Sequence, residues 1–316
     1  MDQSKPLNLD PMMMVDIIQH LQVEYSFGSP SLWNKIADYA LRTGKALPSL
    51  KSVFMAGAPV SSSVLSKVSQ IVTEGEVYTP YGSTEALPVT LAPSKHLKSA
   101  RQKKARSGEQ GTLVGKAISQ VNVKVIEAND LLIEDIGQIK ECPELEIGEI
   151  IVKGRNISQS YFARPEANAE SKIRDGEVFW HRMGDLGYLD GSGNLYFCGR
   201  KAHAVKTQDK IFYSVPCERI FNEHPKVRRS ALVAIEGGKK AAIVIEPISD
   251  AWPSTEEAKR RFQAELLAIG ARDPITEAIT DFFFHPSFPV DGRHNVKIFR
   301  DQLSKWASSQ NEGFKA

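Results

Sequence analysis

Residues 78–85 bring together, in one short stretch, side chains that can bind a nucleotide. The stretch reads Tyr-Thr-Pro-Tyr-Gly-Ser-Thr-Glu and is predicted to leave a short strand as a tight turn. The ring of Tyr81 can stack on a purine, and the hydroxyl of Thr84 can hydrogen-bond a phosphate. Glu85 is a candidate ligand for Mg²⁺, which takes one or two carboxylates together with phosphate oxygens. Taken alone, such a string is as often a polar turn as a nucleotide site.

Two more segments carry groups suited to the base and the ribose of a nucleotide. Residues 56–59, Ala-Gly-Ala-Pro, form a small-residue loop after a predicted strand, where the backbone can approach a flat base closely. Asp185 lies in the run Gly-Asp-Leu-Gly, and an acid there can accept both hydroxyls of a ribose. The competing interpretations are a plain tight turn at 56–59 and a turn aspartate that caps its neighbouring glycines.

Two basic residues lie further along the chain. Arg200 follows a β-like run in the string Gly-Arg-Lys, and Lys297 stands in a turn before a predicted amphipathic helix. A mobile lysine at such a place can neutralise charge that develops between a carboxylate and the α-phosphate of ATP. The competing interpretation of Lys297 is a solvated lysine at a helix start.

The elements that must position these residues change in character along the chain. Residues 1–93 alternate helix and strand signals, with Asp10-Pro11 and Ser29-Pro30 as helix starts, and this alternation predicts an α/β layer with a parallel sheet. Residues 111–199 contain short β-like runs between glycine and aspartate turns, the pattern of a small antiparallel barrel or distorted sheet. Together these two parts are predicted to form one large domain, 1–199.

Residues 200–316 are predicted to form a second, compact α+β domain of ordinary size. Its expected elements are listed here by range: helices near 216–222 and 255–269, and strands at 230–235, 241–245 and 281–285. The Phe-Phe-Phe run within the last strand is predicted to be buried. Cys198 and Cys217 are predicted to be small core residues and not nucleophiles.

The composition is that of a globular protein without a strongly charged partner. Of its 316 residues 41% are hydrophobic, and 40 basic against 38 acidic residues leave a net charge of +2, which predicts no nucleic-acid partner. Three unpaired cysteines suit a reducing cytoplasm. No stretch approaches the roughly 20 apolar residues of a membrane span.

The five segments, taken in their order along the chain, resemble the adenylate-forming superfamily of acyl-CoA synthetases, peptide-synthetase adenylation domains and luciferases. The resemblance extends from about residue 25 to residue 306 and rests on the strings Y-G-S-T-E, G-D-L-G-Y, G-R and K-I-F-R. Each string is weak alone, whereas the ordered set is specific. The resemblance implies an ATP- and Mg²⁺-dependent enzyme that activates a carboxylic acid as its acyl-AMP.

The resemblance also implies a role for each matching residue. Gly57, Ala58 and Pro59 correspond to the wall of the adenine pocket, and Tyr81 to the ring that stacks on adenine, with Gly82 and Ser83 completing that turn. Thr84 corresponds to a phosphate contact, Glu85 to the Mg²⁺ ligand, Asp185 and Arg200 to the residues that hold the ribose, and Lys297 to the lysine that bridges carboxylate and α-phosphate.

Within the superfamily, residues 199–203, 215–218 and 293–300 look most like the olefin β-lactone synthetases. That branch adenylates a long-chain 3-hydroxy acid, whose own hydroxyl then closes a β-lactone without CoA. The loop 207–213 lacks a glycine, and Phe212 and Tyr213 are expected to crowd a pantetheine path. His203 is a candidate general base, although an exposed structural histidine is the competing interpretation. The alternatives are a long-chain fatty acyl-CoA ligase and a non-catalytic nucleotide-binding remnant or interaction module.

One feature of the superfamily is missing, namely the Ser/Thr/Gly-rich loop with a lysine that binds the β- and γ-phosphates of ATP. Neither residues 61–63 nor residues 26–30 have the glycine density for it. The N-terminal half of the large domain is therefore expected to be absent: either this is a truncated or broken gene product, or another chain supplies the missing half. We expect a free sheet edge with an exposed apolar face, and little activity of this chain alone. Phe27 and Trp33 are expected to be buried in an acyl or base pocket.

Two further stretches each have two interpretations. Residues 94–110 are rich in lysine and arginine and form either a solvated loop or a basic site for an anionic substrate. Residues 12–14, three methionines, serve either helix packing or an acyl-chain surface.

Overall fold

The computed structural model describes residues 10–57, 60–97, 110–290 and 298–312. The predictions for Ala58, Pro59, Lys297 and most of the basic stretch 94–110 therefore lie outside the described residues. Within the part that is described, none of the helices has the length and apolar character needed to cross a bilayer.

The N-terminal part packs three helices with three parallel strands. Each helix has a capping side chain, because Asp10, Ser29 and Ser61 accept hydrogen bonds from the first-turn amides that no backbone carbonyl reaches. The apolar stripes of these helices bury Val15, Trp33 and other residues of one core. The elements are α1 (Pro11–His20), β1 (Tyr25–Gly28), α2 (Pro30–Arg42), β2 (Ser52–Met55), α3 (Ser62–Ile71) and β3 (Glu76–Ser83), with β1, β2 and β3 paired in parallel.

The same sheet continues into the β-rich part. Among the described residues it has ten strands, in the order β1-β2-β3-β4-β5-β10-β9-β7-β6, with β8 paired to β9. Every pairing beyond β3 is antiparallel. The further elements are β4 (Ala86–Pro93), β5 (Thr112–Ala117), β6 (Val121–Ile126), the 3₁₀ turn η1 (Ile136–Gln138), β7 (Gly148–Gly154), α5 (Pro165–Ser171), β8 (Lys172–Asp175), β9 (Val178–Leu189) and β10 (Asn194–Arg200).

The C-terminal part has its own sheet, covered on both faces. Strand β13 pairs antiparallel with β14, which pairs parallel with β15. Helices α6 and α7 cover one face through Phe221 and Phe262, and α8 covers the other through Leu303. The elements are η2 (Lys201–His203), β11 (Val205–Lys206), β12 (Ile211–Phe212), α6 (Ser214–Asn222), β13 (Val227–Ile235), η3 (Glu236–Gly238), β14 (Lys240–Pro247), η4 (Ser249–Ala251), α7 (Glu256–Gly270), β15 (Asp281–Phe284) and α8 (Arg300–Glu312).

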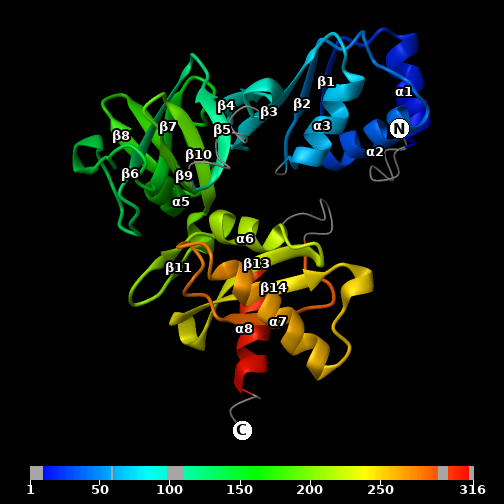
Figure 1. Cartoon of the computed structure of the whole chain (residues 1–316). Helices are drawn as coiled ribbons and strands as arrows, with labels where there is room; N and C mark the ends of the chain where they lie inside the picture. The colour runs from blue at the N-terminus through cyan, green and yellow to red at the C-terminus, as the bar shows by residue number, and fades with distance from the viewer. Residues whose placement is uncertain (1–9, 58–59, 98–109, 291–297, 313–316) are drawn as a thin grey trace.

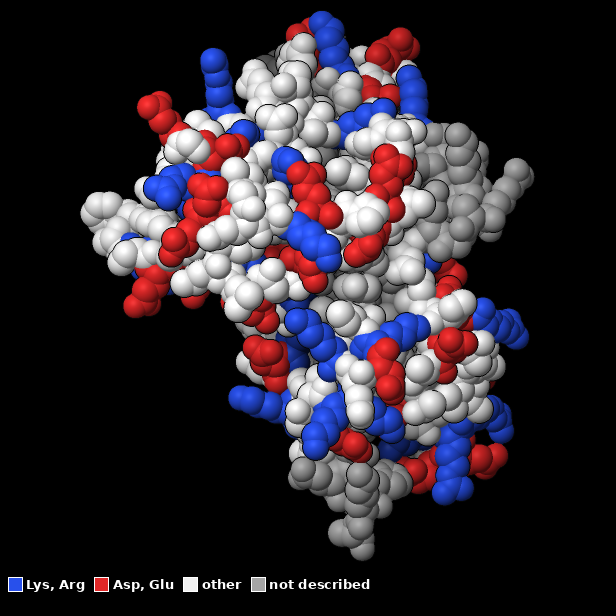
Figure 2. Space-filling view, turned by 90° about the vertical axis from the view of Figure 1, so that its left-hand side faces the viewer, with Lys and Arg blue, Asp and Glu red and all other residues white. Residues whose placement is uncertain are grey.

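Figure 1 shows how the parts are arranged. Helix α6 lies between the β-rich part and the strands β13 and β14, so it forms the joint between the large sheet and the C-terminal part. Figure 2 shows basic and acidic side chains interspersed over the visible face, as expected for a chain of net charge +2.

Several predictions about elements are confirmed. The α/β class, the helix starts at Asp10-Pro11 and Ser29-Pro30, and the short β-runs within residues 111–199 agree with the structure. Phe282 and Phe284 are buried in β15, and Cys198 and Cys217 lie in the cores. Burial raises the pKa of the Cys217 thiol to about 12, which fits an inert core residue.

Other predictions about local structure are wrong. Residues up to Ser83 continue β3, so only Thr84 and Glu85 form the turn, because antiparallel pairing with β4 extends the strand. Asp185 lies inside the twelve-residue strand β9, so the competing interpretation of a turn aspartate is wrong. The alternation of short runs and glycines hid both strands, since glycine at a ladder irregularity reads as a turn signal.

Three side chains are not where they were expected. Phe27 is 65% exposed because β1 stands at the end of the described sheet, although Trp33 is buried as predicted. Phe212 is buried in the core of the C-terminal part, so it does not crowd a pantetheine path. Met12 and Met13 are exposed, and of the three methionines only Met14 packs against the core.

Candidate functional site

The β3–β4 hairpin presents the predicted nucleotide-binding residues. Strand β3 carries Tyr81, Gly82 and Ser83, and Ser83 pairs across to Ala86, which leaves Thr84 and Glu85 as the two turn residues. A Cβ on Gly82 would lie 2.2 Å from the carbonyl oxygen of Ala86. The two strands can therefore approach this closely only with glycine at position 82.

Gly57 lies close to this hairpin. It follows β2 with a φ of +86°, a conformation that favours glycine. Strands β2 and β3 are parallel, with Phe54 opposite Tyr78, so Gly57 and Tyr81 lie three residues further along neighbouring strands. The structure thus brings the small-residue loop and the hairpin to the same end of the sheet.

Tyr81, Asp185 and Arg200 meet on the sheet, although they are far apart in sequence. Arg200 stands directly across from Asp185 in the β9–β10 ladder, with its Nη1 3.0 Å from Asp185 Oδ1. The Tyr81 hydroxyl donates a hydrogen bond of 2.6 Å to Asp185 Oδ2. This group is the centre of the candidate site.

The electrostatics of this group follow from burial. Asp185 is 3% exposed, and burial raises the pKa of its carboxyl above the ordinary value, although Arg200 and the Tyr81 hydroxyl act in the opposite direction. Burial also raises the pKa of the Tyr81 hydroxyl, which keeps it protonated and able to donate. The Arg200 side chain is half exposed and can turn toward a ligand.

Asp185 has room for a further donor. Its Oδ1 is buried and, among the described residues, receives no hydrogen bond of suitable geometry, despite the nearby guanidinium. A buried acceptor without a donor costs free energy. A hydroxyl-bearing ligand such as a ribose fits this need, so the residues present fit the nucleotide that the sequence predicts.

Glu85 has the properties of a magnesium ligand. Burial alone would raise the pKa of its carboxyl, but neighbouring polar groups, among them the Tyr161 hydroxyl that donates to Oε1, hold it below the ordinary value. The described residues contain no group of three or more His, Cys, Asp or Glu that could hold a metal. A single carboxylate fits Mg²⁺, which keeps several waters and binds phosphate oxygens.

Sequence reasoning missed the residues around Glu85. The Tyr161 hydroxyl bonds Glu85 Oε1 at 2.9 Å across 76 residues, and Lys172 and His181 are buried beside Tyr161. No local pattern marks such long-range contacts. The one available signal is polar residues at positions where the alternation of β8 and β9 expects buried apolar ones.

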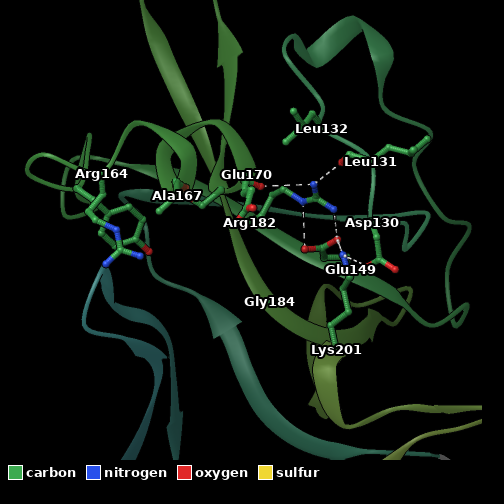
Figure 3. A pocket seen from close by; sticks show the side chains of 12 residues that line it. Asp130, Leu131, Leu132, Glu149, Arg164, Ala167, Glu170, Arg182, Gly184 and Lys201 are labelled. Atoms are coloured by element: carbon green, nitrogen blue, oxygen red, sulfur yellow. Dashed lines mark hydrogen bonds and ion pairs between the residues drawn. The ribbon is translucent and has the colours of Figure 1, made fainter. Parts of the chain in front are cut away.

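A hollow of about 800 Å³ adjoins this site, and Tyr161, whose hydroxyl donates to Glu85, is among the residues that line it. Figure 3 shows Arg182 pointing at Glu149 in its wall, a buried ion pair of 2.6 Å, with Lys201 and Asp130 next to them. None of Tyr81, Thr84, Glu85, Asp185 or Arg200 lines the hollow. The buried charges in its wall already pair with one another. The wall therefore has a structural role, because these pairs join the large sheet to Lys201 of η2.

Comparisons with known proteins identify the family and the fold. The family model of AMP-binding enzymes matches residues 2–162. The olefin beta-lactone synthetase of Xanthomonas campestris pv. campestris is 37% identical over 98% of this chain and 56% of its own length. The chain therefore spans little more than half of that relative.

Solved structures show the same fold. The amide bond synthetase McbA from Marinactinospora thermotolerans matches with a TM-score of 0.72 at 21% identity, over 94% of this chain and 55% of that one. O-succinylbenzoate coenzyme A synthetase (MenE) from Bacillus subtilis, in complex with ATP and magnesium ion, matches with a TM-score of 0.69 at 22% identity, over 93% and 54%.

Proposed function

The chain belongs to the AMP-binding enzyme family, and on that premise we propose that it forms part of a β-lactone synthetase. The reaction would adenylate a long-chain 3-hydroxy acid with ATP and then close it to a β-lactone, releasing pyrophosphate and AMP. The observation that carries this proposal is the 37% identity, over nearly the whole chain, to a protein named olefin beta-lactone synthetase.

Each described site residue has a task in this proposal. Asp185 accepts the ribose hydroxyls, Arg200 adds a donor at the same place, and the ring of Tyr81 lies beside the adenine with Gly57 behind it. Thr84 contacts the phosphate from the exposed turn. Glu85 would hold Mg²⁺, which when bound supplies positive charge against the phosphates.

The remaining predicted roles rest on sequence alone. Lys297, proposed to bridge the carboxylate and the α-phosphate, and Ala58 and Pro59, proposed to line the adenine pocket, are outside the described residues. His203 stays a candidate base for the substrate hydroxyl, and it lies half-buried in η2. Replacing Lys297 by alanine should abolish acyl-AMP formation while leaving AMP binding intact, as measured by calorimetry.

The second step separates the leading proposal from its rival in the same class. A fatty acyl-CoA ligase is favoured by the structural likeness to a coenzyme A synthetase, whereas the lactone synthetase is favoured by the higher identity of its relative. Supplying a 3-hydroxy acid, ATP and Mg²⁺ with and without CoA decides between them. We expect the lactone in both reactions. An acyl-CoA thioester as the product of the reaction that contains CoA would overturn the proposal.

The third candidate is a non-catalytic remnant. Calorimetry of the chain with AMP bears on it, because an intact Tyr81–Asp185–Arg200 group should bind AMP tightly, whereas a remnant should bind AMP weakly or not at all. Absence of AMP binding would favour the remnant.

We also propose that a polypeptide stretch outside this sequence, on the same chain or on another, completes the site by supplying a loop for the β- and γ-phosphates. Tyr25 and Phe27 are 63% and 65% exposed and, as alternate residues of β1, point to the same face of the sheet. In the described part of the chain β1 pairs only with β2. A partner with an apolar surface would cover this edge. We expect turnover by this chain alone to be weak and to rise when such a polypeptide is added.

A further inference from the structure

The Thr84–Glu85 turn is held by a second loop, between β7 and α5. The Ser158 amide donates to the backbone oxygen of Glu85 at 2.8 Å. The Tyr161 hydroxyl donates to Glu85 Oε1 at 2.9 Å. One loop therefore holds both the backbone and the carboxylate of Glu85.

This loop is itself fixed from two sides. Asn168 of α5 holds Tyr161 through two hydrogen bonds. Its Oδ1 accepts from the Tyr161 amide at 2.6 Å, and its Nδ2 donates to the backbone oxygen of Tyr161 at 3.1 Å. Lys172, the first residue of β8, donates through Nζ to the backbone oxygen of Ser158. The same Nζ lies 3.4 Å from the Ser158 hydroxyl. Both attachments of the loop to Glu85 are thus secured by α5 and β8.

The surroundings of Lys172 are unusual for a lysine. It is 7% exposed, its Nζ lies 5.7 Å from the centroid of the Tyr161 ring, and it makes no ion pair with a carboxylate among the residues that the structure describes. A buried ammonium is costly unless its charge is used. His181 stands opposite in the β8–β9 ladder and is uncharged, because burial lowers its pKa to about 4.

The charges in this cluster point to a purpose beyond packing. Lys172 is the cation and Glu85 the anion, with the Tyr161 ring and hydroxyl between them. Apolar side chains would fill the same space at lower cost if packing were the only requirement. The hydroxyl bond takes up one carboxylate oxygen of Glu85 and orients the other.

We propose that Tyr161 and Lys172 are positioning residues that set the orientation of the Glu85 carboxylate for Mg²⁺. This inference rests on the proposed function, in which Glu85 is the magnesium ligand. It adds two residues that do not themselves touch the metal or the nucleotide.

The test is the variant Tyr161→Phe, which removes one hydroxyl and little volume. Calorimetric titrations with ATP over a range of Mg²⁺ concentrations should show that the variant needs about tenfold more Mg²⁺ for half-maximal enhancement of ATP binding, the effect of losing one hydrogen bond to a charged group. AMP binding without Mg²⁺ should be unchanged, because Asp185 and Arg200 are untouched. A purely structural role for Tyr161 would lower both affinities together or neither.

A matched control is Tyr188→Phe. Tyr188 is buried in strand β9 of the large sheet, and its hydroxyl donates to the backbone oxygen of Gln110 at 2.5 Å. This variant therefore also loses one hydroxyl hydrogen bond. Its Mg²⁺ requirement should equal that of the wild type. Lys172→Met, which removes the ammonium and keeps most of the length of the side chain, should raise the Mg²⁺ requirement in the same direction as Tyr161→Phe, with folding checked by thermal unfolding.

The outcomes separate the inference from the function on which it rests. If the wild type does not bind AMP, the proposed function fails and the inference fails with it. If the wild type binds AMP and Tyr161→Phe shows the Mg²⁺ dependence of the wild type, the proposed function stands and the positioning role is wrong.

Discussion

At the scale of single residues, Asp185 illustrates how a binding group differs from a stabilising one. Its carboxyl is nearly inaccessible to water, and one of its oxygens lacks a well-aligned donor. The hydrogen bond from Tyr81 and the ion pair with Arg200 replace only part of the hydration that the buried carboxylate lost on leaving water. Such a group is poised to gain from a ligand that brings the missing donor.

The raised pKa of Asp185 has a consequence for stability. An acid whose pKa is higher in the folded state than in the unfolded state binds protons more tightly when folded, so it lowers stability as pH rises through the interval between the two values. Above that interval the cost is fully present. Removing the charge of Asp185 should therefore remove this cost in the free energy of folding.

The variant Asp185→Asn tests this directly. We expect AMP to bind at least tenfold more weakly, because hydrogen bonds from ligand hydroxyls to a charged acceptor contribute about 1.5–3 kcal/mol. We also expect unfolding at pH 7 at an equal or higher temperature than the wild type, a typical trade of stability for function. Calorimetry and thermal unfolding measure the two quantities, and a large fall in both would mean that Asp185 is structural.

At the scale of elements, the β3–β4 hairpin decides where the site residues lie. Its strands approach so closely at Gly82 that no side chain fits there. The hairpin also fixes the two-residue turn that places Thr84 and Glu85 next to the loop with Ser158 and Tyr161. The geometry of this one turn thus determines where Glu85, the proposed magnesium ligand, lies.

Gly82→Ala should disturb this hairpin. The new Cβ would meet backbone, which cannot move aside as a side chain can, so we expect a loss of about 1–3 kcal/mol in the free energy of unfolding and weaker AMP binding. Gly137→Ala is the control, because the nearest atom to its Cβ is the Asp135 carboxylate at 3.4 Å. Denaturant unfolding of both variants is the measurement, and equal stability of the two would contradict the expectation.

At the scale of the whole molecule, the large sheet and the C-terminal part are joined by a small number of polar contacts and one helix. Lys201 of η2 reaches back to Glu149 at 3.2 Å and to Asp130 at 3.1 Å. Helix α6 lies at the same joint (Figure 1). At the other end of the sheet, β1 exposes aromatic side chains on an edge strand, a feature that favours association.

We therefore expect this chain to self-associate as its concentration rises. Phe27→Glu should reduce the association by placing a charge on the bare strand face. Trp252→Glu, at a residue 44% exposed in the C-terminal part, should leave it unchanged. Sedimentation velocity over a range of concentrations checks both, and equal effects of the two substitutions would show that β1 is not the contact.

Much of the local structure follows from local sequence. Capping side chains before proline predict where α1 and α2 begin, because they satisfy amides within the same few residues. The alternation of helices and strands predicts the α/β class, which the structure confirms. The strands β3 and β9 are longer than the short runs that the sequence predicts, since their lengths depend on partners far away in sequence.

The identity of the chemical groups was readable from the chain itself: a tyrosine, a threonine and a glutamate in one stretch, then an aspartate and an arginine in order. Tertiary structure alone decided that Tyr81 donates to Asp185, that Arg200 stands across from it, and that Tyr161 and Lys172 surround Glu85. The physical reason is that side-chain types and short-range hydrogen bonds are local properties. Burial and the pKa values that follow from it arise only when distant strands are brought together.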